Sequence, residues 1–205
     1  MSQRANPSSD LALVAVFAGL IAAFALTPAI PVGPLGVPIT LQTLAVALTG
    51  MVLGPWRGFL ATLLYLVVGF AGLPVFAQGT SGLGTFAKMS IGYLLAFPLA
   101  AFLIGLLSDR FLRQNRRPRW FWLFAAGLAG SIVFVHPLGV LGMSVNGQIP
   151  LAQAFAADLL YWPGDLIKNA IAAAIAVAVH KAFPTLLARP AADADAVARE
   201  VASTP

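Results

Sequence analysis

The sequence predicts an all-α polytopic membrane protein with six transmembrane helices, both termini in the cytoplasm and an outward-facing ligand pocket. Composition is the first reason, because 60% of the 205 residues are hydrophobic and only 9% are charged, whereas soluble domains carry about 25% charged residues. Length is the second reason, because the chain can supply about six spans of roughly 20 residues with short loops between them. The third reason is the distribution of lysine and arginine, which assigns the loops to the two sides of the membrane.

Composition also excludes several classes of function. The sequence has no cysteine, so it holds neither a disulfide framework nor a thiolate metal site. The net charge of +5 does not indicate nucleic-acid binding, because the basic residues have no folded domain outside the membrane on which to sit. The phosphate-binding pattern Gly-x-x-x-x-Gly-Lys-Ser/Thr is missing from the sequence, so any ATP that drives transport is hydrolysed by another subunit.

Three apolar runs in the first half of the chain predict the first three helices. Residues 11–26 follow Asp10, which suits the N-cap of a helix, and end at a proline-rich segment. A cleavable signal peptide is an alternative for this start, because Arg4 precedes an apolar stretch, but further apolar segments follow it. Residues 41–53 form the second run, a tight Gly-Pro-Trp-Arg-Gly turn comes next, and residues 59–70 form the third run.

Three more runs predict the remaining helices. Residues 89–107 follow a glycine-rich loop, and residues 120–145 are interrupted at His136-Pro137. A weakly amphipathic piece, residues 151–160, leads to the last run, residues 163–181. Proline at the start of this last run suits the first position of a helix, where the missing N–H costs nothing.

Lysine and arginine gather on one side of the predicted bundle. With six spans both termini share a side, which receives ten of the twelve basic residues: Arg4, Arg57, Arg110, Arg113, Arg116, Arg117, Arg119, Lys181, Arg189 and Arg199. Because cytoplasmic loops are enriched in lysine and arginine, this side is predicted to be cytoplasmic. We therefore expect a domain of residues 11–183 in the cell membrane between two cytoplasmic tails, residues 1–10 and a disordered segment, residues 184–205.

An acid and a base stand one turn apart at the head of the sixth predicted helix. Asp165 and Lys168 have i, i+3 spacing, which places them on one helix face. Each ionisable residue in a spanning segment costs roughly 2.5–3.5 kcal/mol, so such residues are candidates for a functional site. A carboxylate accepts N–H donors and an ammonium donates to a carbonyl, so the pair suits a cyclic urea or amide. The alternative is an internal ion pair that only fixes this helix against its neighbours.

Polar residues elsewhere are candidates for the same outer site. Thr40 either caps the second helix or lies at the site, and Gln42 either binds ligand or bridges two helices. Lys88 is the only basic residue besides Lys168 that lies off the cytoplasmic side. Tyr93 is either a packed aromatic residue or a source of a hydroxyl group inside the bundle.

The glycine-rich loop and two other short patterns each allow a functional hypothesis. Gly79 and Gly82 belong to a loop that is either an adaptable connection or a lid over the outer site, with Phe76 as an apolar wall. Gly-Thr-Ser81-Gly also resembles the motif of rhomboid-like intramembrane serine proteases, which need a histidine beside the serine. That need disfavours the protease, because His180 is predicted at the opposite side of the membrane.

Small residues at four-residue spacing mark the first predicted helix. Ala15 with Gly19, and Ala18 with Ala22, let another helix approach closely. These pairs therefore predict a face for a partner protein, although alanine is common in any membrane helix.

Taken together, these motifs resemble the BioY family, the biotin-specific substrate-binding (S) components of energy-coupling-factor (ECF) vitamin transporters. The resemblance covers residues 11–181 and rests on Val37-Pro38-Ile39-Thr40-Leu41-Gln42-Thr43, Gly54-Pro55-Trp56-Arg57-Gly58, Gly72-Leu73-Pro74-Val75-Phe76-Ala77 with the glycine-rich loop after it, Gly92-Tyr93-Leu94 and Pro163-Gly164-Asp165-x-x-Lys168. The chain departs from the family at Lys88-Met89-Ser90-Ile91-Gly92, where the family often has a Gly-Pro-Thr-Gly-Gly-like run, so Lys88 is a candidate contact particular to this chain.

The resemblance implies six membrane helices and high-affinity biotin capture from the outside, without enzymatic activity and without a cofactor. It implies that the positions of Asp165 and Lys168 bind the biotin head group, which an amide from Gln42 would complement. It also implies that the small residues of the first helix pack on a transmembrane coupling subunit driven by paired ATP-binding subunits. A related S component for another small vitamin is the alternative within this class.

Overall fold

The computed structural model describes residues 7–30, 32, 37–117, 119–184 and 186. Within these ranges the chain is helical, and its only extended pairings are two isolated bridges, Ile30 with Ile39 and Phe76 with Thr80. The α-helices are α1 (Pro7–Ala25), α2 (Gln42–Leu53), α3 (Pro55–Phe70), α4 (Ile91–Arg113), α5 (Arg119–Gly130), α6 (His136–Gly147), α7 (Leu151–Asp158) and α8 (Trp162–Ala182). Short helical turns complete the fold: the 3₁₀ turns η1 (Ala77–Gly79) and η2 (Leu83–Ala87), and the π-helical turn η3 (Ser131–Val135).

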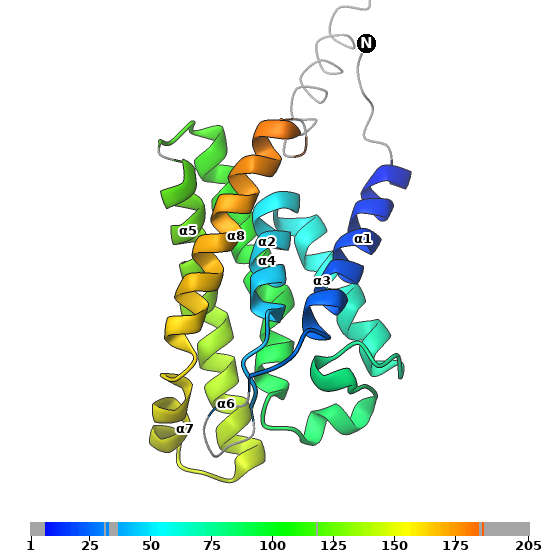
Figure 1. Ribbon diagram of the computed structural model, residues 1–205, viewed down its shortest axis with the longest axis vertical. Helices are drawn as coiled ribbons and strands as arrows, with labels where there is room; N and C mark the ends of the chain where they lie inside the picture. The colour runs from blue at the N-terminus through cyan, green and yellow to red at the C-terminus, as the bar shows by residue number, and fades with distance from the viewer. Residues whose placement is uncertain (1–6, 31, 33–36, 118, 185, 187–205) are drawn as a thin grey trace, which may run out of the picture.

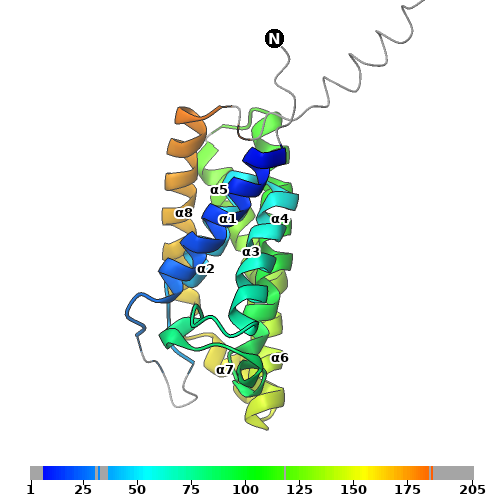
Figure 2. The same ribbon diagram turned by 90° about the vertical axis from the view of Figure 1, so that its right-hand side faces the viewer.

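The helices lie side by side, and the chain reverses its direction along the bundle at successive connections (Figures 1 and 2). As a result, the start of α1 and the end of α8 lie at the same end of the bundle, together with the connection between α4 and α5. Arg57 at the start of α3 ties this end together, because it donates to the Asp10 carboxylate at 3.2 Å and to the backbone carbonyl of Leu186. We call this the terminal end of the bundle.

Four helical segments of the described chain are long and apolar enough to cross a membrane: Ser8–Ala25, Ile91–Arg113, Arg119–Gly147 and Trp162–Ala182. The other two predicted spans are shorter, because α2 has 12 residues and α3 has 16. At 1.5 Å per residue, α2 rises only about 18 Å, well short of the roughly 30 Å of a bilayer core. The prediction of an all-helical membrane protein is therefore confirmed, with four segments of spanning length.

Glycine allows α2 and α3 to form a tight hairpin against α4. The turn between them is Gly54, whose φ of 77° lies in the left-handed region that favours glycine. A Cβ atom at Gly50 would lie 2.6 Å from the carbonyl oxygen of Ala101 in α4. A Cβ atom at Gly105 of α4 would in turn lie 2.6 Å from the carbonyl oxygen of Gly54. Only glycine lets these helices approach so closely, which explains how two short helices are held inside the bundle.

Two sequence predictions about helix ends are wrong in detail. Asp10 does not cap α1, because the helix begins at Pro7 and Asp10 lies in its first turn, where it pairs with Arg57. The interruption expected at His136-Pro137 is a widened turn, since α5, η3 and α6 form one helical segment over Arg119–Gly147. A proline removes one N–H from the helical ladder, and a π turn accommodates that loss without breaking the helix.

The predicted tails lie largely outside the described residues. Of the first tail only residues 7–10 are described, as the start of α1, and of the second only residues 184 and 186. The prediction that the second tail is disordered therefore stays untested.

Candidate functional site

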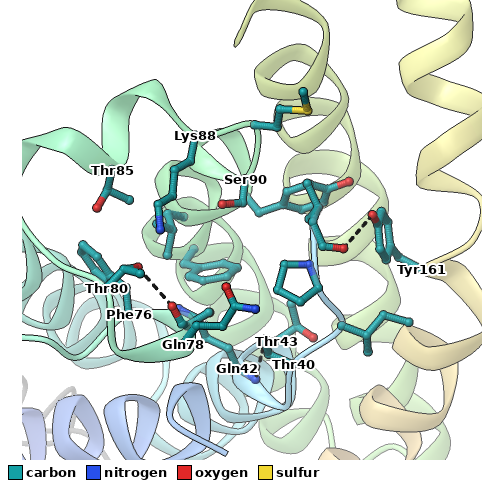
Figure 3. A pocket seen from close by; sticks show the side chains of 18 of the residues that line it. Thr40, Gln42, Thr43, Phe76, Gln78, Thr80, Thr85, Lys88, Ser90 and Tyr161 are labelled. Atoms are coloured by element: carbon teal, nitrogen blue, oxygen red, sulfur yellow. Dashed lines mark hydrogen bonds between the residues drawn. The ribbon is translucent and has the colours of Figure 1, made fainter. Parts of the chain in front are cut away.

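A cavity of about 330 Å³ opens in the half of the bundle away from the terminal end. The first turn of α2, the first two turns of α4 and α8, the segment 37–40 before α2 and the loop that contains η1 and η2 form it together (Figure 3). Its lining residues are Val37, Pro38, Ile39, Thr40, Gln42, Thr43, Phe76, Ala77, Gln78, Thr80, Thr85, Lys88, Met89, Ser90, Tyr93, Leu94, Phe97, Tyr161, Asp165 and Lys168. The volume falls within the range of small-molecule sites, about 300–1,000 Å³.

The acid and the base predicted from their spacing meet on the wall of this cavity. Lys168 Nζ lies 2.5 Å from Asp165 Oδ1, and the two residues are only 8% and 6% exposed. Thr43 at the start of α2 joins them, because its hydroxyl donates to Asp165 Oδ1 at 3.0 Å and accepts from Lys168 Nζ at 2.7 Å. Lys168 also donates to the backbone carbonyl of Thr40 at 3.2 Å. The charged pair therefore joins α8 to the first turn of α2.

Gln42 lines the cavity and is fixed by a tyrosine that the sequence did not single out. Its side-chain amide donates to the Tyr65 hydroxyl at 2.6 Å, and that hydroxyl donates to the backbone carbonyl of Val75 at 3.1 Å. Gln42 thus bridges helices, one of the two roles considered for it, and still lies on the cavity wall. The hydroxyl of Thr40 accepts from the backbone N–H of Gln42 at 3.4 Å, at the beginning of α2.

A second buried carboxylate lies behind the charged pair. Asp158, at the end of α7, has no exposed surface, and it accepts from the Tyr93 hydroxyl at 2.7 Å and from the Trp162 indole at 2.8 Å. His136 Nδ1 lies 2.9 Å from the same carboxylate, while its Nε2 lies 3.6 Å from Asp165 Oδ2. The imidazole stacks on the Trp162 ring, with centroids 4.7 Å apart. A polar chain therefore runs from Tyr93 through Asp158 and His136 to the site.

Two tyrosines, Tyr93 and Tyr161, line the cavity near the Asp165–Lys168 pair and the buried Asp158. Tyr93, predicted either to pack or to offer its hydroxyl, does offer the hydroxyl, but to Asp158. Tyr161 precedes α8 and donates to the backbone carbonyl of Val37 at 3.0 Å (Figure 3). Burial, with a smaller contribution from the Asp158 carboxylate, raises the pKa of the Tyr161 hydroxyl above its ordinary value. This hydroxyl therefore remains a hydrogen-bond donor at neutral pH and holds the segment before α2 against α8.

The loop with η1 and η2 forms the remaining wall. Phe76 is fully buried, lines the cavity and packs edge-on against Tyr65, with ring centroids 5.5 Å apart. Gly79 and Gly82, which were candidate binding residues, are not among the lining residues. They have φ values of 69° and 75°, so they shape the turns that present their neighbours to the cavity. Whether the loop acts as a lid stays a prediction.

The candidate partner residues of α1 lie away from the cavity and fall on two faces. Ala15 and Gly19 are exposed, whereas Ala18 is buried and Ala22 packs against the same internal cluster. None of the four lines the cavity. The small-residue pair that a partner could reach is therefore Ala15 with Gly19.

The serine near the glycine-rich loop has no histidine partner among the described residues. His136 is engaged with Asp158 and Asp165, and His180 with the backbone carbonyl of Met51 at 2.8 Å. Because a serine nucleophile needs a base within hydrogen-bond reach, the geometry at Ser81 gives no support to a protease.

Several residues of this site were missed by sequence reasoning. The sequence indicates only a weakly amphipathic piece around Asp158, and it marks His136 only as part of the interruption in the fifth apolar run. A signal did exist, since both are ionisable residues next to apolar runs. No signal in the sequence relates Tyr65 to Gln42, because 23 residues separate them and only the folded chain brings them together.

Comparisons with known proteins agree on one family. The sequence profile described as the BioY family matches residues 1–185. A biotin transporter BioY from Rhizobium etli is 37% identical over 182 residues, which cover 88% of this chain and 97% of the relative. A biotin transporter BioY from Rhodobacter capsulatus is 39% identical over 193 residues, covering 88% of this chain and 98% of the relative.

A solved structure matches the fold over most of its length. It is the crystal structure of the S-component for biotin from an ECF-type ABC transporter, with a TM-score of 0.81 and 29% sequence identity. The match covers 88% of this chain and 95% of the other.

Proposed function

This chain belongs to the BioY family, and from that premise we propose that it is the substrate-capture subunit of an ECF-type biotin transporter. It binds biotin in the cavity formed by α2, α4 and α8 and performs no chemical reaction on it. The names of its relatives and the likeness to the S-component for biotin support this assignment. The single observation in the molecule that carries it is the buried pair of Asp165 and Lys168 on the wall of a cavity of ligand size.

The ureido ring of biotin matches the chemistry of this pair. The ring offers N–H donors beside a carbonyl acceptor, and the pair offers an acceptor beside a donor. Among the described residues, the polar contact of Asp165 Oδ2 is the one with His136 Nε2 at 3.6 Å, so this is the oxygen best able to accept a ureido N–H. Lys168 Nζ donates hydrogen bonds to the Thr43 hydroxyl and the Thr40 carbonyl and forms an ion pair with Asp165, and the longest of these contacts is the 3.2 Å bond to the Thr40 carbonyl. The ureido carbonyl takes the place of one of these acceptors.

The walls of the cavity suit the rest of the biotin molecule. Phe76, Phe97 and Met89 supply apolar surface for the thioether ring and the methylene chain. Gln42 is the first residue of α2. Its NH₂ group already donates to Tyr65, so its amide oxygen is the group that it offers to the ligand. These groups give the few convergent polar contacts in a mostly apolar pocket that are typical of small-molecule sites.

We place residues 11–183 in the cell membrane with six passes, the terminal end in the cytoplasm and the cavity on the outer side. Arg57, Lys181 and the arginines between α4 and α5 lie toward the terminal end, which supports this orientation by the enrichment of basic residues in cytoplasmic loops. The α2–α3 hairpin crosses as two short helices enclosed by longer ones. The tails, residues 1–10 and 184–205, are then cytoplasmic.

The outer face of α1 is the proposed contact with the coupling subunit. Ala15 and Gly19 are exposed there one turn apart, and a Cβ atom built on Gly19 meets nothing within 4 Å. Small residues at this spacing allow two membrane helices to approach closely. A transmembrane coupling subunit with its ATP-binding subunits is the partner that this face would receive.

Ligand binding by the protein purified in detergent tests the proposal. Mass spectrometry of the extracted ligand separates biotin from other vitamins, and titration calorimetry gives the affinity. We expect Asp165→Asn and Lys168→Met each to weaken biotin binding by about 10- to 150-fold, since a hydrogen bond to a charged group contributes about 1.5–3 kcal/mol. Asp109→Asn is the matched control, because Asp109 pairs with Arg113 in the terminal half of α4. Normal binding by both site variants, or loss of folding without loss of affinity, would contradict the assignment.

A further inference from the structure

The cavity contains a second cation that the ion pair of α8 does not use. Lys88 is exposed and belongs to the lining, whereas Lys168 is buried at the inner wall. Within the ranges that the structure describes, the ammonium group of Lys88 has no ion-pair partner and no hydrogen-bond acceptor. Its charge is therefore available to a ligand at the mouth of the cavity.

The backbone beneath this side chain is held in place. The Lys88 N–H donates to the Thr85 carbonyl at 3.0 Å, and the Lys88 carbonyl accepts from the Asn146 side chain at 2.8 Å and from the N–H of Ile91 at 3.1 Å. The residue is thus fixed between η2, α4 and the end of α6. Its side chain extends into the opening, and Ser90 is also directed there (Figure 3). The Thr80 hydroxyl instead donates to the backbone carbonyl of Ala77 at 3.0 Å.

The inner end of the cavity carries a paired acid and base, whereas its mouth carries the unpaired ammonium of Lys88 among the lining residues. Asp165 is the only acidic residue among those that line the cavity, and it lies 2.5 Å from Lys168. A ligand carboxylate beside Lys168 would therefore also meet the Asp165 carboxylate, and like charges at such distances repel each other. A ligand carboxylate beside Lys88 would meet its ammonium group, and no acidic residue of the cavity lining lies next to Lys88 to repel it. The inner end suits a neutral polar ring and the outer end suits an anion.

We propose that Lys88 is the subsite for the carboxylate of the ligand, so that biotin enters with its ureido ring toward α8 and its valerate carboxylate remains at the mouth. The proposal rests on the proposed function and fixes the direction in which the ligand lies. Ser90, whose hydroxyl lies at the same opening, can add a neutral hydrogen bond to the same carboxylate. The subsite makes the free acid the preferred form of the ligand over its esters and amides.

Comparing biotin with biotin methyl ester tests this subsite, because the ester keeps the ring and removes the charge. We expect the unmodified protein to bind biotin about tenfold more tightly than the ester, a value for a hydrogen-bonded charge pair that is partly open to water. Lys88→Met should weaken biotin binding by about the same factor and leave ester binding unchanged. Lys88→Arg should retain the preference for the acid, and rising salt should weaken only the binding of the acid.

The controls separate this inference from the proposed function. The Lys181→Met variant loses an exposed lysine at the end of α8 that lies away from the cavity. It should bind both ligands as the unmodified protein does. If the unmodified protein binds neither ligand, the proposed function fails. If it binds both equally well and Lys88→Met changes neither affinity, only the Lys88 subsite is overturned. An equal loss of both affinities in Lys88→Met also overturns it, since that result would mean that Lys88 shapes the loop.

Discussion

His136 Nδ1 lies 2.9 Å from the carboxylate of Asp158, and this contact joins two helices through a residue with no exposed surface. The same carboxylate accepts from Tyr93 of α4 and Trp162 of α8. Because each buried charge needs several hydrogen-bond partners, Asp158 is stable only where α4, α6 and α8 all meet. The contact therefore sets the positions of the helices that form the ligand cavity.

Removing the imidazole is the first test of this arrangement. We expect His136→Phe to destabilise the protein by about 1–3 kcal/mol, because a fully buried carboxylate loses one of its donors. The result should be a decrease of several degrees in the thermal unfolding temperature in detergent. Biotin affinity should fall less than in Asp165→Asn, since His136 reaches the site only through the 3.6 Å contact with Asp165.

A double-mutant cycle separates the pair from a general packing defect. Asp158→Asn removes the charge, so His136→Phe should cost less in that background, with a coupling energy of about 0.5–3 kcal/mol. Additive effects of the two substitutions would show that the contact contributes nothing of its own.

The sequence allowed the charged pair to be predicted because its two residues lie within one turn of one helix. The geometry of a helix fixes i, i+3 neighbours, and the structure does bring Asp165 and Lys168 to 2.5 Å. Thr43, Tyr65 and Asp158 could not be assigned to the site in this way. Their contacts join residues that are 122, 23 and 65 positions apart, and tertiary packing alone determines them.

Apolar runs predicted the existence of α2 and α3 and the residues where they end, but not the packing that holds two such short helices in the bundle. The predicted runs 41–53 and 59–70 end where α2 and α3 end, at Leu53 and Phe70, because the chain turns at Gly54 after α2 and at Gly72 after α3. Close glycine contacts with α4 hold these short helices, and such contacts depend on which helices are neighbours. Composition contains no information on that choice.

The hydroxyl of Tyr65 is predicted to contribute to binding from behind the cavity wall. Tyr65→Phe leaves the Gln42 amide without its 2.6 Å acceptor and the Val75 carbonyl without its donor. We expect biotin affinity to fall by about 3- to 10-fold, because Gln42 and the loop around Phe76 are less well fixed. Thr62→Ala is the matched control on α3, since within the described part of the chain that hydroxyl bonds to the carbonyls of Gly58 and Phe59 in its own helix. Equal affinities of the Tyr65 and Thr62 variants would refute this role.

The crossing of α4 and α6 is predicted to depend on Gly92. A Cβ atom there would lie 2.8 Å from the carbonyl carbon of Leu138 and 3.0 Å from the backbone nitrogen of Gly142. Because backbone atoms cannot move aside as side chains do, Gly92→Ala should destabilise the protein by about 1–3 kcal/mol. Gly84→Ala is the control in the preceding loop, where nothing lies within 4 Å. Thermal unfolding of both variants in detergent measures the difference, and equal unfolding temperatures would count against the close crossing.

Adjacent positions on α1 should separate folding from partner binding. Ala18 is 7% exposed and packs in the internal cluster with Ile21 and Tyr65, whereas Gly19 faces outward. Ala18→Leu should therefore lower the unfolding temperature, because overpacking a well-filled core costs about 1–3 kcal/mol. Gly19→Leu adds the same side chain to an open face, so its unfolding temperature and biotin affinity should match those of the unmodified protein. In cells or vesicles that contain the coupling and ATP-binding subunits, however, Gly19→Leu should reduce biotin uptake, because the added side chain prevents close approach of the partner helix. Normal uptake by this variant, with the expected loss of stability in Ala18→Leu, would mean that the partner binds another face of the bundle.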